Sequence, residues 1–570
     1  MNPFLPPSVP DQLQTAIGLL HQRRPGEAAR ILRGVASAHP SLADVRRLFG
    51  LALRDCGDRA GAESELRAAL TLDPASGPAA VSLSELLLGG GRGEEAAAVL
   101  DVLAGSPSAD IHVLTANGDA LMAIGRLDDA IAAYDRAVGA APGSAVAEHN
   151  LALALGEAQR FGDSEAATRR AFAKGLDGLE TWLVHARALF GQGRFPEAEA
   201  AYREAVRRRP DHVVAQGELA QLIWMQTEDA ANATTVIDAA IEAFPMLQAL
   251  SLKKAEVLDF AGFPEAAYDV VAPIAARPDA EAMVQVIAAR LSMRQDAARA
   301  LAHATIGIRG LPDDDVALAT LCEAHLAGGD IDNALAAAAR LHERAPLNQH
   351  GIGLLATAWR LAGDARYAAL HDHQGLVRAG RIDTPEGWPD LDAYLADLAV
   401  SLGRLHTLRT HPVGQSVRHG SQTTQPLTLS GDPVIQAFFR AVDGPIRRYL
   451  DALGVGDDVV RSRNTGAYGL NGAWSVRLRA GGHHTDHLHP HGWLSSACYI
   501  ALPPAIERGH EGWLRFGQPG VSTVPTMAAE RFVKPEPGLL VLFPSYMWHG
   551  TVPFTGDQPR LTVAFDVVPA

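Results

Sequence analysis

Five histidines lie within nine residues near the carboxyl end of the chain, in the stretch Gly481-Gly482-His483-His484-Thr485-Asp486-His487-Leu488-His489-Pro490-His491. Imidazole is a frequent metal ligand in proteins. Three kinds of region would hold histidines at this density: a flexible tract that sequesters metal, a surface of biased composition, or a catalytic metal site. The tract alone does not separate these alternatives, whereas the residues that follow it do.

The third candidate ligand lies far downstream. His549 comes sixty residues after His489 and ends a run that starts with the turn Pro537-Gly538. Arg560 follows eleven residues later, and Thr562 comes two residues after it. Over residues 400–570, this order resembles the double-stranded β-helix of the 2-oxoglutarate/iron(II) oxygenases, in particular the prolyl-hydroxylase-like branch.

Further motifs resemble a bacterial oxygenase family that is often fused to tetratricopeptide repeats. They are His411-Pro412, Gln415-Ser416-Val417-Arg418, Gln422-Thr423, Trp493-Leu494-Ser495-Ser496 and Phe543-Pro544-Ser545. The resemblance implies Fe(II) as the metal, 2-oxoglutarate as the co-substrate and O2 as the oxidant. Arg418, Gln422 and Thr423 are candidates for the mouth of the substrate site.

The chemistry of such a centre accounts for the spacing. Non-haem iron(II) takes three protein ligands on one face, which leaves positions for co-substrate and oxygen. Two ligands that stand two residues apart on a strand project to the same side. The resemblance makes Arg560 the cation that binds the far carboxylate of 2-oxoglutarate, in bidentate fashion. Thr562 would point the same way, and Tyr499 is either a further hydrogen-bond partner of the co-substrate or a core residue.

Two ligand sets remain open. The pair His484 and Asp486 gives the usual His-x-Asp pattern, whereas His487 and His489 give a His-x-His variant; His549 completes either set. We favour His487, His489 and His549, because His487 stands at the family's distance after Gly481-Gly482 and because Pro490 follows as a strand terminator would. This set departs from the family's rule of two histidines and one carboxylate. We interpret His483 and His491 as solvated or supporting residues.

Short runs of β-type residues surround these candidates. We expect strands at Thr424–Leu429, Trp474–Arg479, Trp493–Ala501, Trp513–Phe516, Leu539–Phe543 and Leu561–Val567, and one helix at Asp432–Leu453 that Pro445 kinks or splits. A second helix is expected at Leu391–Leu405. Many short strands separated by turns indicate a sandwich or barrel, and the resemblance specifies a double-stranded β-helix (jelly roll).

The first two-thirds of the chain is a repeat with a period of 34 residues. One series of alanines keeps that spacing or twice that spacing: Ala28, Ala62, Ala96, Ala130, Ala198, Ala266, Ala300 and Ala334, with Ser164 and Asn232 in the skipped places. The period and the helix-turn-helix pattern resemble the tetratricopeptide family. We therefore expect an all-α solenoid of about ten repeats at residues 11–374, a connector at 375–399 and an oxygenase domain at 400–570.

The composition narrows the class of partner and the compartment. The formal net charge is −15 and no long basic run occurs, which argues against nucleic acid or an anionic membrane as the main partner. No apolar run approaches the length of a membrane span, and the first ten residues do not resemble a signal peptide. The three cysteines are far apart and fit no disulfide frame, so we expect a cytoplasmic protein.

These observations predict an Fe(II)/2-oxoglutarate-dependent dioxygenase that hydroxylates a protein or peptide side chain captured by the repeats. Two alternatives stay open. One is a three-histidine, cupin-like dioxygenase that uses no 2-oxoglutarate, and the other is a tetratricopeptide scaffold without catalysis. A small-molecule substrate for the same chemistry is a third possibility.

Overall fold

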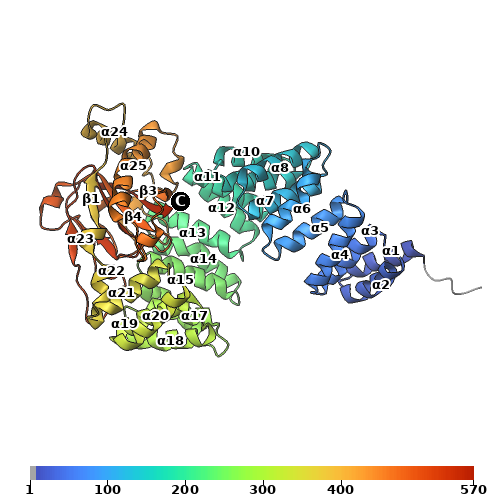
Figure 1. Cartoon of the computed structure of the whole chain (residues 1–570), viewed down its shortest axis with the longest axis horizontal. Coiled ribbons are helices and arrows are strands. Elements are labelled where there is room, and N and C mark those ends of the chain that lie inside the picture. The colour runs from blue at the N-terminus through green and yellow to red at the C-terminus, as the bar shows by residue number, and fades with distance from the viewer. Residues whose placement is uncertain (1–7) are drawn as a thin grey trace, which may run out of the picture. The chain divides into compact units, whose positions relative to one another are not determined.

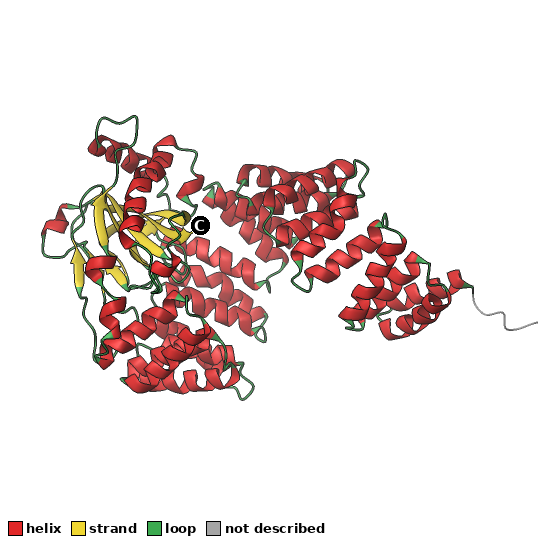
Figure 2. Ribbon diagram, in the orientation of Figure 1, coloured by secondary structure: helices red, strands yellow, loops and turns green. Residues whose placement is uncertain are grey.

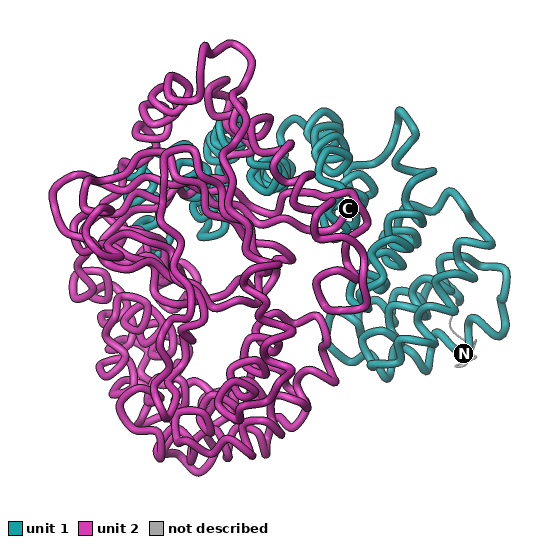
Figure 3. Tube along the Cα trace, turned by 60° about the vertical axis from the view of Figure 1, so that its left-hand side comes forward, with its two compact units in different colours: residues 1–209 teal, residues 210–570 magenta. Residues whose placement is uncertain are grey.

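The computed structural model describes residues 8–570. These residues divide into two compact units, one that ends at residue 209 and one that comprises residues 210–570 (Figure 3). The first unit is helical. The second contains further helices and a β-domain (Figure 2).

Twenty helices, α1 to α20, follow one another as ten antiparallel pairs in the described chain (Figure 1). In the first unit the pairs are α1 (Val9–His21) with α2 (Pro25–Ala38), α3 (Ala43–Asp55) with α4 (Arg59–Leu72), α5 (Gly77–Leu88) with α6 (Gly93–Gly105), α7 (Ile111–Ala123) with α8 (Leu127–Ala140), α9 (Ala145–Glu157) with α10 (Phe161–Ala173) and α11 (Leu179–Gly191) with α12 (Phe195–Arg208). In the second unit they are α13 (Val213–Thr227) with α14 (Ala230–Ala243), α15 (Gln248–Phe260) with α16 (Pro264–Ala275), α17 (Ala282–Ser292) with α18 (Ala297–Gly310) and α19 (Asp315–Gly328) with α20 (Ile331–Arg344), followed by α21 (Gln349–Ala362). The predicted all-α helical solenoid is confirmed.

The alanine series marks where the helices of a pair approach each other. Ala28, Ala62, Ala96, Ala130, Ala198, Ala300 and Ala334 have no exposed surface. The phase slips by one residue in two repeats, where Ala233 and Ala267 are buried while Asn232 and Ala266 are exposed. Helix α13 is 15 residues long and α17 only 11, so one residue is gained before α14 and lost again at α17.

The β-domain consists of two antiparallel sheets, as in a jelly roll. The larger sheet has the strand order β1-β7-β4-β9-β3-β2 and the smaller one β6-β5-β8. Their bounds are β1 (Arg378–Arg381), β2 (Val417–Gln422), β3 (Tyr468–His484), β4 (Leu494–Ala501), β5 (Leu514–Phe516), β6 (Arg531–Val533), β7 (Leu539–Pro544), β8 (His549–Thr551) and β9 (Arg560–Pro569). Five of the six predicted strands correspond to β3, β4, β5, β7 and β9.

The structure differs from the prediction at two places. The strand expected at Thr424–Leu429 is wrong: the strand there is β2, and Leu427–Leu429 forms a single 3₁₀ turn after Pro426, which has no N–H to give to a sheet. Residues 375–399 are not a plain connector, because β1 lies among them and pairs with β7 at the edge of the large sheet. All four residues of β1 are exposed, so no alternation marked this strand.

Helices pack against the large sheet and close its core. Helices α24 (Leu391–Gly403) and α25 (Pro433–Leu453) share one hydrophobic cluster with strands β4, β7 and β9. Helix α25 is continuous through Pro445. The short helices α22 (Arg366–Leu370) and α23 (His373–Leu376) join α21 to β1. No helix among residues 8–570 has the length and apolar character needed to span a membrane.

Within residues 210–570, the helical pairs are bonded directly to the β-domain. Arg479 of β3 forms an ion pair of 2.7 Å with Glu228 after α13. The backbone N–H of Val524 donates to the carbonyl of Leu326 in α19 at 3.1 Å. A guanidinium nitrogen of Arg360 in α21 donates to the Gly517 carbonyl at 2.6 Å. The last repeats therefore fix the position of the β-domain.

Candidate metal centre

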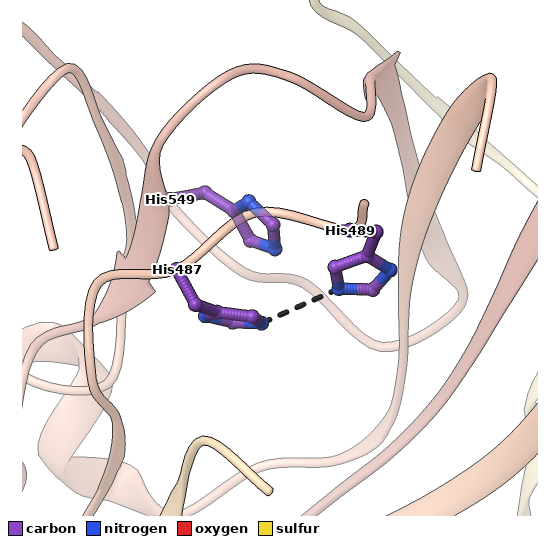
Figure 4. A group of neighbouring side chains, drawn as sticks. All are labelled: His487, His489 and His549. Atoms are coloured by element: carbon purple, nitrogen blue, oxygen red, sulfur yellow. Dashed lines mark hydrogen bonds between the residues drawn. The ribbon is translucent and has the colours of Figure 1, made fainter. Parts of the chain in front are cut away.

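Three imidazole rings converge inside the β-domain. His487, His489 and His549 each offer a ring nitrogen, and these nitrogens lie within 4.8 Å of one another (Figure 4). The ring centres are 4.3 Å apart for His487 and His549, and 5.2 Å from His489 to each of the other two. The Nε2 atoms of His487 and His489 are 3.3 Å apart. This is a spacing at which one ion can touch all three.

Backbone pairing positions the three rings. Strand β3 ends at His484, and the extended segment after it forms a two-bond bridge between His487 and His549, with N–H to carbonyl distances of 2.9 and 3.0 Å. The N–H of His489 donates to the Ser545 carbonyl at 3.0 Å. Because side chains alternate along extended backbone, His487 and His489 point inward while Leu488 points to the other side.

Each ring is held by a hydrogen bond from its Nδ1–H. The acceptors are the Thr485 carbonyl for His487 at 2.8 Å, the Met547 carbonyl for His549 at 2.9 Å and a carboxylate oxygen of Asp566 for His489 at 2.6 Å. These acceptors cannot donate, so the proton sits on Nδ1 and the lone pair is on Nε2. Three Nε2 lone pairs are thereby presented to the shared space.

The alternative pair is not assembled in the same way. Asp486 is turned toward Arg515, and its two oxygens accept from that guanidinium at 2.6 and 2.8 Å. His484 stacks on His487 with ring centres 5.7 Å apart, and its Nδ1 lies 2.9 Å from the Ser416 hydroxyl. Asp486 therefore already has a bidentate partner away from the three rings.

A cavity of about 730 Å³ opens beside the three rings. Its lining includes Arg560, Thr562 and Asp566, which alternate along β9 and share one face. Arg560 is only 2% exposed, forms no ion pair within the described chain and leaves its Nε without a hydrogen-bond partner. A buried guanidinium without a carboxylate is costly to maintain, so this one is suited to receive an anion.

Two family models match the chain. The model described as "Putative 2OG-Fe(II) oxygenase" matches residues 472–566. The tetratricopeptide repeat model matches residues 47–110, 115–145 and 183–245. The chain therefore contains tetratricopeptide repeats within residues 47–245 and, at residues 472–566, a domain that matches the 2OG-Fe(II) oxygenase model.

Solved structures similar to this chain include tetratricopeptide-repeat proteins. MamA is 19% identical, covers 30% of this chain and 94% of its own, and has a TM-score of 0.28. YrrB, described as a TPR protein with an unusual peptide-binding site, is 15% identical over 33% of this chain and 96% of its own, with a TM-score of 0.29. Yeast Tom70 is 11% identical over 70% of this chain and 96% of its own, with a TM-score of 0.36. No curated protein matches the chain.

Burial keeps two of the three rings, His487 and His549, neutral. Burial is the largest cause that lowers the pKa of His487, to about 3, and neighbouring His489 lowers it further. Burial likewise holds the pKa of His549 well below its usual value. A neutral imidazole is the form that binds metal, so these two rings are in a ligating state at neutral pH.

The remaining residues predicted for the site differ in whether they line the cavity. Tyr499 is fully buried behind Arg560, whose guanidinium carbon lies 4.9 Å from the centre of the tyrosine ring, and it is not part of the cavity lining. Arg418 and Gln422 line the cavity. Thr423 does not, and its hydroxyl instead accepts from the Ser475 N–H.

Four residues of the site were not anticipated. They are Asp566 and Ser416 beside the rings, Arg515 on Asp486, and Phe260, a residue of α15 that lines the cavity. Asp566 falls in the same alternation as Arg560 and Thr562, so that pattern would have found it. Nothing in the local sequence marks Phe260, because its place depends on how the solenoid meets the oxygenase domain.

Proposed function

We propose that this chain is an Fe(II)/2-oxoglutarate-dependent dioxygenase that hydroxylates a side chain of a protein or peptide. The observation that carries the proposal is the presence of three convergent Nε2 atoms and an unpaired, buried guanidinium on one cavity. The oxygenase family model supports the class of chemistry. A cupin-like centre that uses no 2-oxoglutarate would provide no anion for the buried guanidinium of Arg560 to bind.

The donor set suits iron(II). Three imidazoles on one side of a site leave the opposite side open, as non-haem iron oxygenases need. The three converging rings lack the carboxylate ligand that is usual in the family, and Asp566 lines the cavity beside them, hydrogen-bonded to His489. A carboxylate in this position raises the basicity of a ligating histidine. We infer that Asp566 supplies the negative charge that the ligand set lacks.

The anion pocket suits 2-oxoglutarate. The far carboxylate of the co-substrate would bind Arg560, with the hydroxyl of Thr562 on the same face of β9. Tyr499 would act indirectly, since its ring supports the guanidinium from behind. When bound, iron and 2-oxoglutarate together supply the oxidising power that protein side chains lack.

The chain's own residues bind, orient and shield. The backbone bridge between His487 and His549 fixes the positions of these two candidate ligands relative to each other. The hydrogen-bond acceptors at Nδ1 keep each of the three rings in the tautomer that has its lone pair on Nε2. Residues around the cavity exclude bulk water and position the substrate. The tetratricopeptide repeats would bind the substrate protein and raise its effective concentration at the centre. We also place the protein in the cytoplasm, which its three unpaired cysteines support.

The test is an anaerobic titration of the Fe(II)-loaded protein with 2-oxoglutarate, followed through the metal-to-ligand absorption band. We expect the wild type to give the band and His489→Ala to lose it. Asp486→Ala should keep the band, because Asp486 pairs with Arg515. Arg560→Ala should require much more 2-oxoglutarate.

Turnover separates the remaining alternatives. Production of succinate from 2-oxoglutarate is expected of the wild type and not of a cupin-like dioxygenase or a scaffold. A band that survives His489→Ala and disappears in Asp486→Ala would overturn the ligand set. Iron binding with neither band nor succinate would overturn the function.

A further inference from the structure

A tryptophan of β3 borders the cavity beside the three histidines. Trp474 lines this cavity, and the centre of its ring lies 5.8 Å from that of His489, with the two planes 34° apart. The residue is half-buried, and among the described residues its Nε1–H has no hydrogen-bond acceptor. An aromatic side chain with a free donor therefore adjoins the proposed metal centre.

A β-bulge directs Trp474 toward the cavity. The register of β3 against β9 shifts between Asn471 and Ala473, and the extra residue is Gly472, which has a φ of +71°. Glycine takes this left-handed conformation without steric cost, and bulges next to active sites re-aim the side chains near them. A β-carbon on Gly472 would lie 3.1 Å from the Trp474 ring. The glycine thus provides both the turn and the room for the ring.

Small side chains form the floor of the cavity next to this ring. Ala564 is the partner of Trp474 across the ladder of β3 and β9. It lines the cavity from β9, and Ala497 lines the cavity from β4. Both alanines are only half-buried, although β4 and β9 are interior strands of the large sheet. Because protein interiors are close-packed, the unfilled space above the two alanines is a slot that a ligand can occupy.

The charges around the cavity disfavour an ionised side chain in this slot. Among the described residues of the lining, Arg418, Arg560 and Asp566 carry a formal charge. The carboxylate of Asp566 is already bonded to His489 and Ser495, at 2.6 and 2.9 Å. A cationic side chain would be repelled by the two guanidinium groups, and the negative face of an indole ring disfavours an anion. The side chain that suits the slot is uncharged.

We propose that Trp474 and the slot beside it select a neutral aromatic side chain as the residue that is hydroxylated. The inference rests on the proposed function and names its substrate class, a polypeptide that presents Phe, Tyr or Trp to the centre. A flat ring fits above the two alanines and stacks against the indole, offset or edge to face, as aromatic pairs prefer.

The reaction at this side chain balances with the co-substrates already named. One atom of O2 enters a C–H bond of the side chain, and the other enters 2-oxoglutarate, which leaves as succinate and CO2. The four electrons that reduce O2 come in equal parts from the C–H bond and from the decarboxylation. No further reductant is needed.

The test uses the full chain loaded with Co(II), without 2-oxoglutarate, and fluorescein-labelled pools of random peptides whose central residue is fixed as Phe, Leu, Lys or Asp. Fluorescence anisotropy measures the affinity for each pool. We expect the Phe pool to bind about three- to ten-fold more tightly than the Leu pool, which is the effect of one aromatic pair. The Lys and Asp pools should bind more weakly than the Leu pool.

Variants of the ring and of the bulge distinguish recognition from a structural role. Trp474→Leu should bind the Phe and Leu pools equally, whereas Trp474→Tyr keeps a ring and should retain the preference. Gly472→Ala should lose the preference, because the new β-carbon displaces the ring. Gly466→Ala is the matched control: Gly466 has a φ of +79°, has open space around its β-carbon and does not line the cavity, so the wild-type preference is expected.

A Leu, Lys or Asp pool that binds the wild type as tightly as the Phe pool would overturn the proposal, as would an unchanged Phe preference in Trp474→Leu. If Gly472→Ala does not fold, the two Trp474 variants decide. Binding needs neither iron nor turnover, so its result is independent of the 2-oxoglutarate titration. A missing absorption band together with a Phe preference that Trp474→Leu abolishes would refute the oxygenase function and leave the aromatic slot standing.

Discussion

At the scale of single residues, the proposed metal centre depends on groups outside its set of candidate ligands. His489 is oriented by the carboxylate of Asp566, which also accepts from the Ser495 hydroxyl at 2.9 Å. In most sites of this kind the carboxylate is itself a ligand. In the centre that we propose, Asp566 would act through His489, which would keep its charge near the metal and leave three imidazoles as the direct donors.

Asp566→Asn therefore tests the centre without removing a ligand. The amide keeps the shape but loses the charge, so we expect the affinity for a divalent metal to fall by about 10- to 100-fold. Isothermal titration with Co(II) measures the change. Asp557→Asn, an exposed aspartate in the loop before Arg560, is the control and should bind Co(II) like the wild type. Wild-type affinity in Asp566→Asn would contradict this role.

The sequence predicts the candidate ligands better than it predicts their supports. His487, His489, His549 and Arg560 follow from spacing and resemblance, and the structure brings the three histidines together beside the arginine. Which of two neighbouring pairs would face inward was harder to predict, because β3 stops at His484 and the later residues continue in a loop. From His487 onward the backbone is extended again and bridges to His549, so side chains alternate between the two faces once more.

At the scale of elements, helix α21 supports both ligand-bearing segments. Leu488, between the two proximal histidines, and Trp548, next to the distal one, turn outward and pack in one cluster with α21. Gly353 lies at the contact: a β-carbon there would be 2.6 Å from a Leu488 methyl and 3.1 Å from the Tyr546 carbonyl. The absence of a side chain lets the helix approach the loop.

Gly353→Ala is expected to displace the ligand loop although it lies outside the metal site. We expect Co(II) affinity to fall several-fold and stability to drop by about 1–2 kcal/mol, since overpacking a filled contact is destabilising. Gly328→Ala in α19 has open space around its β-carbon and should gain stability instead. Adding Leu488→Ala to Gly353→Ala should restore metal binding, and failure of that rescue would exclude the contact as the cause.

Element prediction succeeded where patterns are long and failed where they are short. The helical repeats and the long strand β3 carry strong periodic signals. Strand β1 has the sequence Arg-Ala-Gly-Arg with every side chain exposed, so its assignment depends on pairing with β7, which lies far away in sequence. Tertiary pairing, not local preference, decides such an edge strand.

At the scale of the whole second unit, two buried histidines lie where the repeats join the oxygenase domain. His371 stacks on Tyr367 with ring centres 4.7 Å apart, and burial lowers its pKa to about 3. His411 lies against Trp224, and burial lowers its pKa to about 3 as well. Both are neutral in the folded protein over most of the pH range.

This arrangement predicts acid sensitivity with a definite sign. The unfolded chain protonates these histidines near pH 6.5, whereas the folded chain resists protonation down to about pH 3. The unfolded state therefore binds more protons in that window, and the free energy of unfolding falls as the pH decreases through it. We expect a loss on the order of a few kcal/mol, measured as a lower urea midpoint by tryptophan fluorescence.

His371→Phe should reduce the loss of unfolding free energy at acid pH, because phenylalanine keeps the stacking on Tyr367 and cannot titrate. His112 is exposed and lies in the first unit, so His112→Gln should lose as much unfolding free energy at acid pH as the wild type does. A His371→Phe variant as acid-sensitive as the wild type would show that other groups dominate.

The presence of Phe260 in the cavity wall constrains how this architecture can diversify. Insertion or loss of a 34-residue module between α13 and α21 would put another residue in place of Phe260 and would break the bonds from Glu228, Leu326 and Arg360 to the oxygenase domain. Among the described residues, those that line the cavity all lie at position 260 or beyond. Among relatives with this architecture, we therefore expect the number of repeats to vary freely near the amino end and to stay constant beside the oxygenase domain.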